Sequence, residues 1–574
     1  MKKLILFIGI IPFVMKGQGG WTKITSTLNP VTTFTAPGIY KGAAWVDINN
    51  DGNTDLFAMP NFMFLNTGGG NFTQLSNLNI NPVPTQNPGG CSWADINNDG
   101  NIDFITAQNP SEIYLNNGNN TFQNFSANIP ALSGYAAWGC ALADVNNDNR
   151  LDLLYAQAYG FHGSATPTPC NFFIQDVASF SFSQKKGYAF TDSLKPYTVP
   201  YFHDYDMDGD MDLFIATGPG GSPGPDYCYR NMKKETGLDT LYKMTVEPWS
   251  TQLQDGQCYN AIDFDNDGDL DLCLTNYSGA SSRFYINSNG IYTGITMPFT
   301  NTASHLSNAW GDFDNDGDLD VIMAFDNSIS KYYRNNGNGS FTQLTSTFAA
   351  PTLNSCIISC DYDNDGDLDV FVDGNDNAKA IYKNDTVAGS RKWINYTFKG
   401  TVSNRSAIGA IIKVKAIING MPVWQIRTIT AQNSFQGQND LRQHVGLGDA
   451  SQVDSVLIYW PSGLKEFYIN KPINQFETFI EGNGTPLSIK QTINNVSFKI
   501  YPNPSNGIFY VETTAFQKDI SIGIEDIQGR MILESKLAQS KTIFRMDTSE
   551  GFYFIKIYDK MLGLLSVKKI YITK

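Results

Sequence analysis

The sequence is short of positive charge. Lys and Arg together number 40 against 55 Asp and Glu, which leaves a formal net charge of −15. Nucleic acids and anionic membrane surfaces are bound through basic patches, so a chain this acidic suits neither. We therefore expect no nucleic acid and no anionic membrane among its partners.

A long hydrophobic run is also missing. The longest apolar stretch, residues 4–15, is interrupted by a glycine and a proline and follows Lys2 and Lys3. A helix needs about 20 apolar residues to span a bilayer, whereas a short apolar run behind basic residues is typical of a secretory signal peptide. We expect residues 1–17 to be that signal peptide, no transmembrane segment, and a mature chain exported in soluble form.

Cysteine and histidine are scarce. The eight cysteines contain no CxxC pair, which argues against a zinc site. In an exported protein some can form disulfides, and Cys170 with Cys228 is one candidate pair; buried thiols are the alternative.

Only four histidines are present, and His203, which adjoins an acidic segment, is better explained by packing than by acid–base chemistry. We predict no catalytic residue.

One nonapeptide recurs seven times, and we number its copies loop 1 to loop 7. They read DINNDGNTD, DINNDGNID, DVNNDNRLD, DYDMDGDMD, DFDNDGDLD twice and DYDNDGDLD, and they start 48, 49, 60, 59, 49 and 49 residues apart. This spacing fits one four-stranded blade per repeat, because a β-unit of this size cannot bury both of its faces alone. The pattern predicts an all-β fold with a seven-bladed β-propeller over residues 18–392; an open row of β-units is the alternative.

The two ends of this region indicate how the ring closes. WTKITSTL from Trp21 matches FTQLTSTF from Phe341, a fourth-strand sequence that the seventh repeat lacks. We expect the N-terminal strand to complete the last blade, which removes two exposed sheet edges. Asn-Gly clusters such as those in YLNNGNNTF and YRNNGNGSF predict hairpin turns after the third strands.

Each nonapeptide supplies the oxygen ligands that calcium prefers. Positions 1, 3, 5 and 9 carry Asp or Asn, position 7 offers its backbone carbonyl, and Gly at position 6, replaced by Asn149 in loop 3, permits a positive φ. An EF-hand is excluded because position 12 is never Glu. The predicted metal-site residues are Asp47, Asn49, Asp51, Asn53 and Asp55; Asp95, Asn97, Asp99, Asn101 and Asp103; Asp144, Asn146, Asp148, Arg150 and Asp152; Asp204, Asp206, Asp208, Asp210 and Asp212; Asp263, Asp265, Asp267, Asp269 and Asp271; Asp312, Asp314, Asp316, Asp318 and Asp320; and Asp361, Asp363, Asp365, Asp367 and Asp369.

These loops hold 29 of the 55 acidic residues. Their mutual repulsion requires neutralisation, and up to seven calcium ions would supply it and stabilise the fold. Loops 4–7 have four ligand carboxylates each against three in loops 1–3, so the later loops should bind calcium more tightly. Solvated acidic turns without metal are the alternative.

The loops resemble the VCBS or FG-GAP calcium-loop repeats of integrin-α-like propellers over residues 21 to about 392, although a literal FG-GAP string does not occur. The resemblance implies structural metals, and a ligand that meets the opposite face of the ring.

The second half of the chain resembles two other families. Residues 393–482, with NRSAIGA, HVGLGD and YWPSG, are similar to the ASPIC/UnbV domain, which follows such propellers in proteins similar to cartilage acidic protein. A linker over 483–497 precedes residues 498–574, whose YPNP opening, Gly-Arg turn and GFYFIK strand resemble the C-terminal sorting domain of type IX secretion. We expect two small β-sandwich-like domains after the propeller, and the type IX secretion machinery as a partner, with the product secreted or attached to the cell surface.

Two function classes remain. Insertions in repeats three and four carry Tyr159, Phe161, His162 and Tyr227, an aromatic set that predicts a binding patch for an extracellular glycan or protein. Plain loop variation explains these insertions equally well. We expect a binding or adhesion module; an extracellular polysaccharide lyase or hydrolase, with Tyr, His or Arg converging at the central channel, is the alternative.

Overall fold

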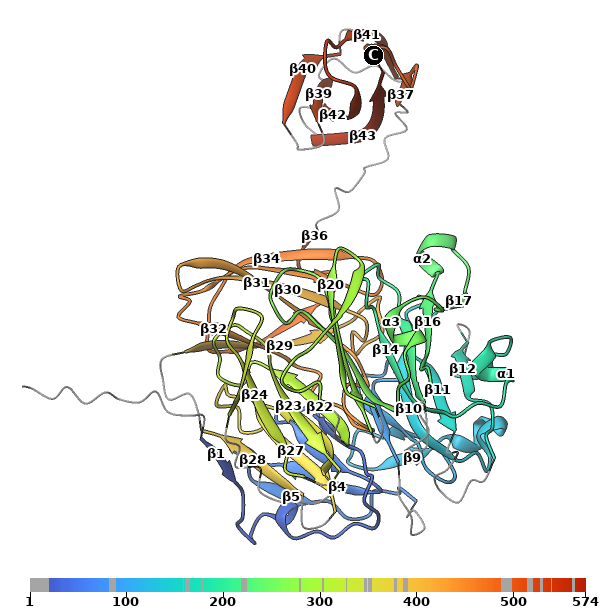
Figure 1. Cartoon of the computed structure of the whole chain (residues 1–574), viewed down its shortest axis with the longest axis vertical. Helices are drawn as coiled ribbons and strands as arrows, with labels where there is room; N and C mark the ends of the chain where they lie inside the picture. Colours follow the sequence, from blue (N-terminus) through green and yellow to red (C-terminus); the bar gives the residue numbers. More distant parts are fainter. Residues whose placement is uncertain are drawn as a thin grey trace, which may run out of the picture. The chain divides into compact units, whose positions relative to one another are not determined.

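The computed structural model of the chain describes residues 20–81, 89–157, 159, 166–176, 179–217, 224–277, 280–301, 304–326, 328–344, 348, 354–375, 379–385, 391–486, 498–513, 520–526, 530–537, 539–559 and 563–573. The predicted signal peptide lies outside them. The chain forms two compact units, residues 1–485 and 486–574, which we describe separately. Both consist of β-sheets, as predicted (Figure 1).

Residues 21–384 form seven four-stranded antiparallel sheets. Sheet 1 contains β2 (Ala43–Val46), β3 (Asp55–Ala58), β4 (Phe62–Asn66) and β5 (Phe72–Gln74); sheet 2 contains β6 (Cys91–Ala94), β7 (Asp103–Thr106), β8 (Glu112–Asn116) and β9 (Phe122–Asn124); sheet 3 contains β10 (Ala137–Ala143), β11 (Asp152–Gln157), β12 (Asn171–Gln175) and β13 (Phe182–Gln184). Sheet 4 contains β14 (Tyr197–His203), β15 (Asp212–Thr217), β16 (Tyr227–Asn231) and β17 (Leu241–Lys243); sheet 5 contains β18 (Gly256–Ile262), β19 (Asp271–Asn276), β20 (Arg283–Ser288) and β21 (Ile291–Ile295). Sheet 6 contains β22 (His305–Gly311), β23 (Asp320–Phe325), β24 (Lys331–Asn335) and β25 (Phe341–Leu344); sheet 7 contains β26 (Asn354–Cys360), β27 (Asp369–Gly374), β28 (Ala380–Asn384) and β1 (Trp21–Lys23). Short helices lie between them: η1 (Pro30–Thr32), η2 (Ser126–Asn128), η3 (Pro130–Leu132), α1 (Ala189–Asp192), α2 (Lys233–Thr236) and α3 (Pro248–Thr251).

The sheets close into a ring. Strand β1 pairs with β28, Trp21 lying opposite Asn384, which confirms that the N-terminal strand completes the last sheet. The first strands contact one another in the order β2, β6, β10, β14, β18, β22 and β26, and β26 contacts β2. The sheets are therefore the blades of a β-propeller, and the first strand of each blade lines the centre.

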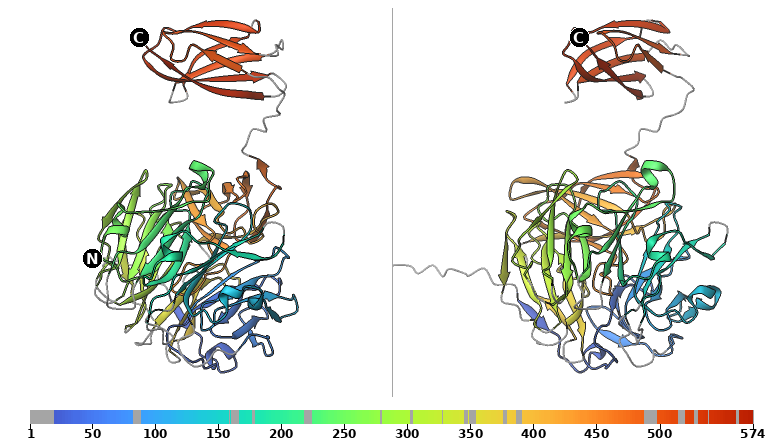
Figure 2. Two further views of the ribbon diagram at one scale, coloured as in Figure 1. Left: turned by 90° about the vertical axis from the view of Figure 1, so that its right-hand side faces the viewer. Right: turned by 45° about the vertical axis from the view of Figure 1, so that its right-hand side comes forward.

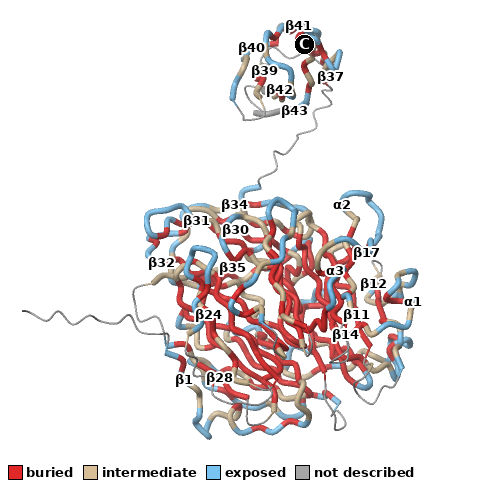
Figure 3. The backbone as a smooth tube through the Cα atoms, in the orientation of Figure 1, coloured by how far each residue is buried: buried red, intermediate tan, exposed pale blue. Residues whose placement is uncertain are grey.

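Aromatic side chains fill the space between blades. The aromatic residues that stand two places before loops 1 and 2 are fully buried: Trp45 stacks on Tyr362 of loop 7 with ring centroids 6.0 Å apart, and Trp93 lies 5.0 Å from Phe57 of the preceding blade. The blade strands form the buried part of the unit (Figure 3). Each blade thus buries its two faces against its neighbours, as the repeat length requires.

Residues 392–486 form two more sheets within the same unit. A three-stranded sheet contains β32 (Gln443–Gly448), β29 (Lys392–Lys399) and β35 (Phe476–Ile480), and a five-stranded sheet contains β31 (Met421–Thr428), β30 (Ile411–Ile418), β33 (Val453–Tyr459), β34 (Lys465–Lys471) and β36 (Thr485–Pro486). These sheets lie across one end of the blades (Figure 2). Ile105 and Leu142 of the propeller share one hydrophobic core with Ile412 and Val445, so we call residues 392–485 the cap.

A segment of the cap fills the centre of the ring. Residues 429–442, between β31 and β32, are here called the plug segment. Its Ser434, Phe435, Gln436 and Gln438 are buried at 0–1% exposure. It touches the first strand of every blade, through hydrogen bonds in six of them and through the ring of Trp138 in blade 3.

The contacts of the plug segment are mostly polar. The Gln438 side chain accepts a hydrogen bond from Trp93 N at 2.7 Å and donates one to Trp93 O at 3.0 Å. Ser434 Oγ donates to Ile357 O at 2.7 Å, and the backbone N–H of Phe435 donates to Ser307 Oγ at 3.0 Å. Inner-strand polar groups that would otherwise face a water-filled channel are thereby satisfied by the cap.

The candidate disulfide between Cys170 and Cys228 does not form. All eight cysteines are buried free thiols. Cys170 packs with Phe190 in the core between blades 3 and 4, whereas Cys228 packs with Trp249 in the core of the next pair of blades. The two thiols therefore face different cores, which sequence spacing could not reveal.

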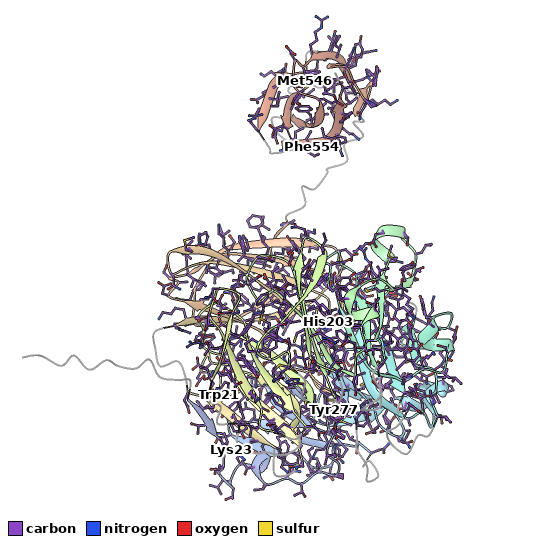
Figure 4. All side chains as sticks on the ribbon, in the orientation of Figure 1. Trp21, Lys23, His203, Tyr277, Met546 and Phe554 are labelled. Atoms are coloured by element: carbon purple, nitrogen blue, oxygen red, sulfur yellow. The ribbon has the colours of Figure 1, made fainter. Side chains whose placement is uncertain are left out.

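The second unit is a two-sheet β-structure with its own core. One sheet contains β37 (Phe498–Tyr501), β38 (Ile508–Thr513) and β41 (Lys541–Arg545), and the other contains β40 (Met531–Lys536), β39 (Ile520–Asp526), β42 (Gly551–Asp559) and β43 (Gly563–Ile572). Phe509, Ile522 and Ile555 are fully buried between them, with Met546 at the edge of the same core (Figure 4).

Gln438 provides a test of the plug segment. We expect Gln438→Ala to lower the free energy of unfolding by about 1–3 kcal/mol, because it leaves the buried N–H and C=O of Trp93 unpaired. The control is Gln452→Ala, at an exposed position of the cap. Equal urea midpoints for the two variants would show that the plug segment adds nothing to the ring.

Candidate metal centres on the propeller rim

The first aspartate holds the loop closed in six of the seven loops, loop 5 being the exception. Asp47 accepts hydrogen bonds from the backbone N–H groups of Asp51 and Gly52, at 3.1 and 2.9 Å. The same pair occurs in loops 2, 3, 4, 6 and 7. The sixth residue has a positive φ in every loop, including 70° at Asn149, as predicted. The fourth residue also has a positive φ, 54–60°, which the sequence pattern did not predict.

The ninth aspartate ties the loop to its own blade. The carboxylate of Asp55 accepts hydrogen bonds from the backbone N–H groups of Ile48, in the loop, and Asn66, at the end of the third strand, at 3.1 and 2.7 Å. All seven blades repeat this pair. The predicted closing ligand is therefore also a structural anchor, and in Asp55 each carboxylate oxygen accepts one of these two bonds and keeps a second lone pair for a cation.

The last residue of the third strand links neighbouring blades. Asn335 Nδ2 donates to Leu319 O in its own loop at 3.1 Å and to Phe264 O in loop 5 at 2.8 Å. Blades 1, 2, 4 and 7 do the same with an asparagine. In blade 3 Gln175 reaches the preceding loop, and in blade 5 the Tyr292 hydroxyl bonds both loops. The Asn-Gly pattern predicts only turns at these asparagines, although their regular place at a strand end is visible in the repeats.

The fourth residue of a loop reaches the next loop around the rim. Asn266 Nδ2 donates to Gly317 O at 3.1 Å, and Asn364 Nδ2 donates to Asn53 Oδ1 at 3.3 Å across the closure of the ring. Loops 1, 3 and 6 make equivalent contacts. Loop 4 has Met207 at this place, so its side chain cannot donate such a bond. These contacts connect loops 5, 6, 7, 1 and 2 in one run and loops 3 and 4 in another.

Carboxylates gather into candidate cation sites in loops 4–7. Five groups have three carboxylate oxygens within 4.8 Å of one another: Asp204, Asp206 and Asp212; Asp208, Asp210 and Glu235; Asp263, Asp265 and Asp267; Asp312, Asp314 and Asp316; and Asp361, Asp363 and Asp365. Within the described residues no such group occurs in loops 1–3, where Asn stands at the third position. Glu235, on α2, lies outside the nonapeptides, so the sequence pattern did not reveal it.

These groups fit a hard divalent cation. Asp263 is fully buried, and both of its carboxylate oxygens lack a hydrogen-bond partner among the described residues. The other four groups each attract a cationic side chain: Arg230 lies 2.7 Å from Asp206 and 2.5 Å from Glu235, Arg391 lies 2.5 Å from Asp314, and Lys383 pairs with Asp363. Calcium prefers six to eight oxygen ligands of this kind. The donor sets of loops 4–7 therefore match a divalent metal ion.

Burial raises the pKa of several aspartates in the seven loops. It raises the pKa of Asp55 and Asp103 to about 8, and desolvation together with the charges of Asp267 and Asp265 raises the pKa of Asp263 to about 7. A proton and a metal ion compete for the same oxygens. Cation binding at the rim should therefore strengthen as the pH rises through this range.

A small cavity lies where the plug segment leaves the ring. Its volume is about 110 Å³, and His203, Arg427 and His444 lie in its lining. Burial lowers the pKa of both histidines to about 4, and their Nε2 atoms face the carbonyl oxygens of Tyr259 and Gly366 at 3.2 and 3.0 Å. His203 lies within the propeller (Figure 4). The cavity is smaller than ligand pockets, which are roughly 300–1,000 Å³.

The predicted aromatic patch is only partly visible. Phe161 and His162 lie outside the described residues. Tyr227 is half-buried, and its ring lies 4.6 Å from that of Tyr197 and under the ammonium group of Lys243. The patch stays a prediction.

Family models match three parts of the chain. The FG-GAP-like repeat matches residues 104–155, 263–323 and 312–372; the ASPIC and UnbV model matches residues 400–486; and the secretion system C-terminal sorting domain matches residues 499–573. The three resemblances drawn from the motifs are thereby confirmed. The sorting domain indicates export by type IX secretion to the cell surface or the extracellular space.

Several solved structures have a distant likeness to the chain. PorZ, an essential bacterial surface component of the type-IX secretion system of Porphyromonas gingivalis, is 11% identical, with 94% of this chain and 82% of PorZ covered and a TM-score of 0.20. Rhamnogalacturonan lyase YesW is 10% identical, with coverage of 62% and 91% and a TM-score of 0.27. The PL11 rhamnogalacturonan lyase of Bacillus licheniformis is 12% identical, with coverage of 79% and 92% and a TM-score of 0.32. A search of curated proteins finds no significant match.

Among the described residues, every helix is too short or too polar to cross a bilayer.

The asparagine link between blades can be tested at Asn335. We expect Asn335→Ala to lower the free energy of unfolding by about 1–3 kcal/mol, because two buried carbonyl groups lose their donor. The neighbouring Asn336 is exposed and bonds only within its turn, so Asn336→Ala is the matched control. If both variants unfold at the same urea concentration, the link does not stabilise the ring.

The raised pKa values give the metal-free protein a defined pH dependence. The folded pKa of Asp55 and Asp103, about 8, lies above the ordinary value of 3.8, so these groups bind more protons when folded. The stability that they add is fully present below the ordinary pKa and is lost as the pH rises through the folded pKa. In chelator, the free energy of unfolding should fall between about pH 4 and pH 8. Calcium should add more stability at the upper end of that window, and a pH-independent calcium effect would contradict this account.

Proposed function

We propose that this chain is an exported, calcium-stabilised β-propeller that acts as a binding or adhesion module for an extracellular glycan or protein. Export is indicated by the sorting-domain match. The observation that carries the calcium proposal is the set of five carboxylate groups in loops 4–7, one of which contains a buried aspartate without hydrogen-bond partners. Calcium there would neutralise charge that the buried rim cannot otherwise tolerate.

The centre of the ring favours binding over catalysis. A polysaccharide lyase or hydrolase on this scaffold needs catalytic groups around an open central channel. Here the plug segment occupies that place, and the Arg427 guanidinium and the two histidines beside it bond to backbone carbonyl groups. The cavity that they leave, about 110 Å³, is small for a sugar ring with its neighbours.

Calcium removal tests the proposal. We expect chelator to lower the melting temperature of the whole chain, and calcium to restore it, because an ion that binds only the folded state adds about 2.7 kcal/mol at a hundred times its Kd. Elemental analysis of the dialysed protein should find at least one ion for each of loops 4–7. Magnesium at equal concentration is the control, since it tolerates irregular oxygen cages poorly.

Two results would reject the proposal. An unchanged melting temperature in chelator would remove the calcium role. Release of new reducing ends or unsaturated products from a polysaccharide would show that the chain is a hydrolase or lyase and not a binding module.

A further inference from the structure

Loop 5 differs from loops 4, 6 and 7 in the basic side chains that pair with its carboxylates. Loops 4, 6 and 7 each contact a basic side chain, from Arg230, Arg391 and Lys383 respectively. Among the described residues no such ion pair reaches loop 5, and Ile286 stands in its blade where Arg230 stands in blade 4. Against the desolvation that raises the pKa of the buried Asp263, the guanidinium of Arg427 lowers that pKa, whereas the exposed Asp265 and Asp267 have no ion pair among the described residues and are left for an external cation.

Loop 5 is also open where loops 6 and 7 are covered. A Cβ atom added at Gly366 would lie 2.0 Å from the ring of Trp393, and one at Gly317 would lie 2.7 Å from Ile418 Cδ1. At Gly268, the equivalent residue of loop 5, it would meet nothing within 4 Å. The cap thus lies directly on loops 6 and 7 and leaves space beside loop 5.

The three carboxylates of loop 5 combine a buried and an accessible side. Asp263 is fully buried and its oxygens lack partners, whereas Asp265 and Asp267 are exposed. One oxygen of each lies within 4.8 Å of the others. An ion held by them has protein on one side and solvent on the other.

A groove opens on that solvent side. Its volume is about 520 Å³, which is within the range of ligand pockets. One side consists of loop 5 and Asp318, and the other consists of Lys413 and Trp424 on β30 and β31 of the cap. Trp424 is half-exposed, and Lys415 lies over its ring at 5.8 Å. We call this space the loop-5 groove.

The coordination chemistry leaves positions for a ligand. The loop can offer four side-chain carboxylates and one backbone carbonyl, whereas calcium takes six to eight oxygens. With one oxygen from each group, at least one coordination position of a bound ion would be left for water, and ligand oxygens from the groove could replace that water.

The charges around the groove select the kind of ligand. Asp265, Asp267 and Asp318 are opposed by Lys413 alone among the lining residues, so one divalent ion balances the remaining negative charge of the lining. A neutral ligand then needs no further charge compensation. Neutral hydroxyl groups can coordinate the ion and donate hydrogen bonds to the same carboxylates, and the apolar face of a sugar ring can pack on an indole.

We propose that the loop-5 groove binds a neutral, hydroxyl-rich saccharide, with two adjacent hydroxyl groups on the loop-5 ion and a sugar ring against Trp424. The inference rests on the calcium part of the proposed function and deepens it. It places ligand binding on the calcium-loop face, between propeller and cap, and not on the opposite face that the family resemblance implies.

The test uses the full chain and an array of neutral oligosaccharides, with oligogalacturonates as the acidic comparison. We expect calcium-dependent binding of neutral members, weakened by about tenfold or more in Trp424→Ala, a loss that corresponds to ~1.4 kcal/mol. Asp267→Asn should weaken it as well. The matched aromatic control is Tyr242→Ala, at a residue 65% exposed in blade 4, which should leave binding unchanged.

Calcium-induced change in melting temperature is recorded in parallel on each variant. If calcium raises the melting temperature normally but no neutral saccharide binds, the proposal that the loop-5 groove binds saccharide is rejected, and the proposal of a calcium-stabilised propeller is retained. Three further results would reject the proposal for the loop-5 groove: saccharide binding that persists in chelator, binding that persists in Trp424→Ala, and a preference for the acidic oligomers. Loss of the calcium shift in the unmodified chain would remove the proposed function, and the groove with it.

Discussion

The hydrogen bonds around the ninth aspartate of each loop are the constraint on which the propeller depends. Apolar contacts between blades are non-directional and would allow the blades to slide or rotate. A buried carboxylate tolerates no such freedom, because each unpaired oxygen costs free energy. Asp320 fixes loop 6 to its blade, and Asn335 fixes that blade to loop 5. Repeated around the ring, these bonds set the angle between blades and place the loop carboxylates side by side.

The cap packs directly against loops 6 and 7 of the same rim. Gly446 approaches Asp312 so closely that a Cβ atom there would lie 1.9 Å from its carboxylate, and Gly366 faces Trp393. Arg442 donates to the backbone oxygen of Asp361 at 2.8 Å. Metal ions in the rim would therefore also lie beneath the cap, and the stabilities of propeller and cap should be coupled.

The sequence predicted what repeats and could not predict what occurs once. Regular spacing revealed the blades, the match between Trp21 and Phe341 revealed how the ring closes, and the loop pattern revealed where carboxylates gather. The plug segment has no period and no motif, since its partners are backbone groups such as those of Trp93, far away in the chain. The openness of the loop-5 groove likewise depends on how the cap docks, which no local pattern near Trp424 encodes.

The plug segment also fixes an order of events in time. Thr22 bonds a residue 363 positions later, and Gln438 bonds one 345 positions earlier. Contacts between such distant parts of a chain are slow to form, because the loop between them must close first. The last blade cannot be completed until residue 385 has been synthesised, and the axis cannot be filled until residue 438 has, so closure of the propeller is a late step.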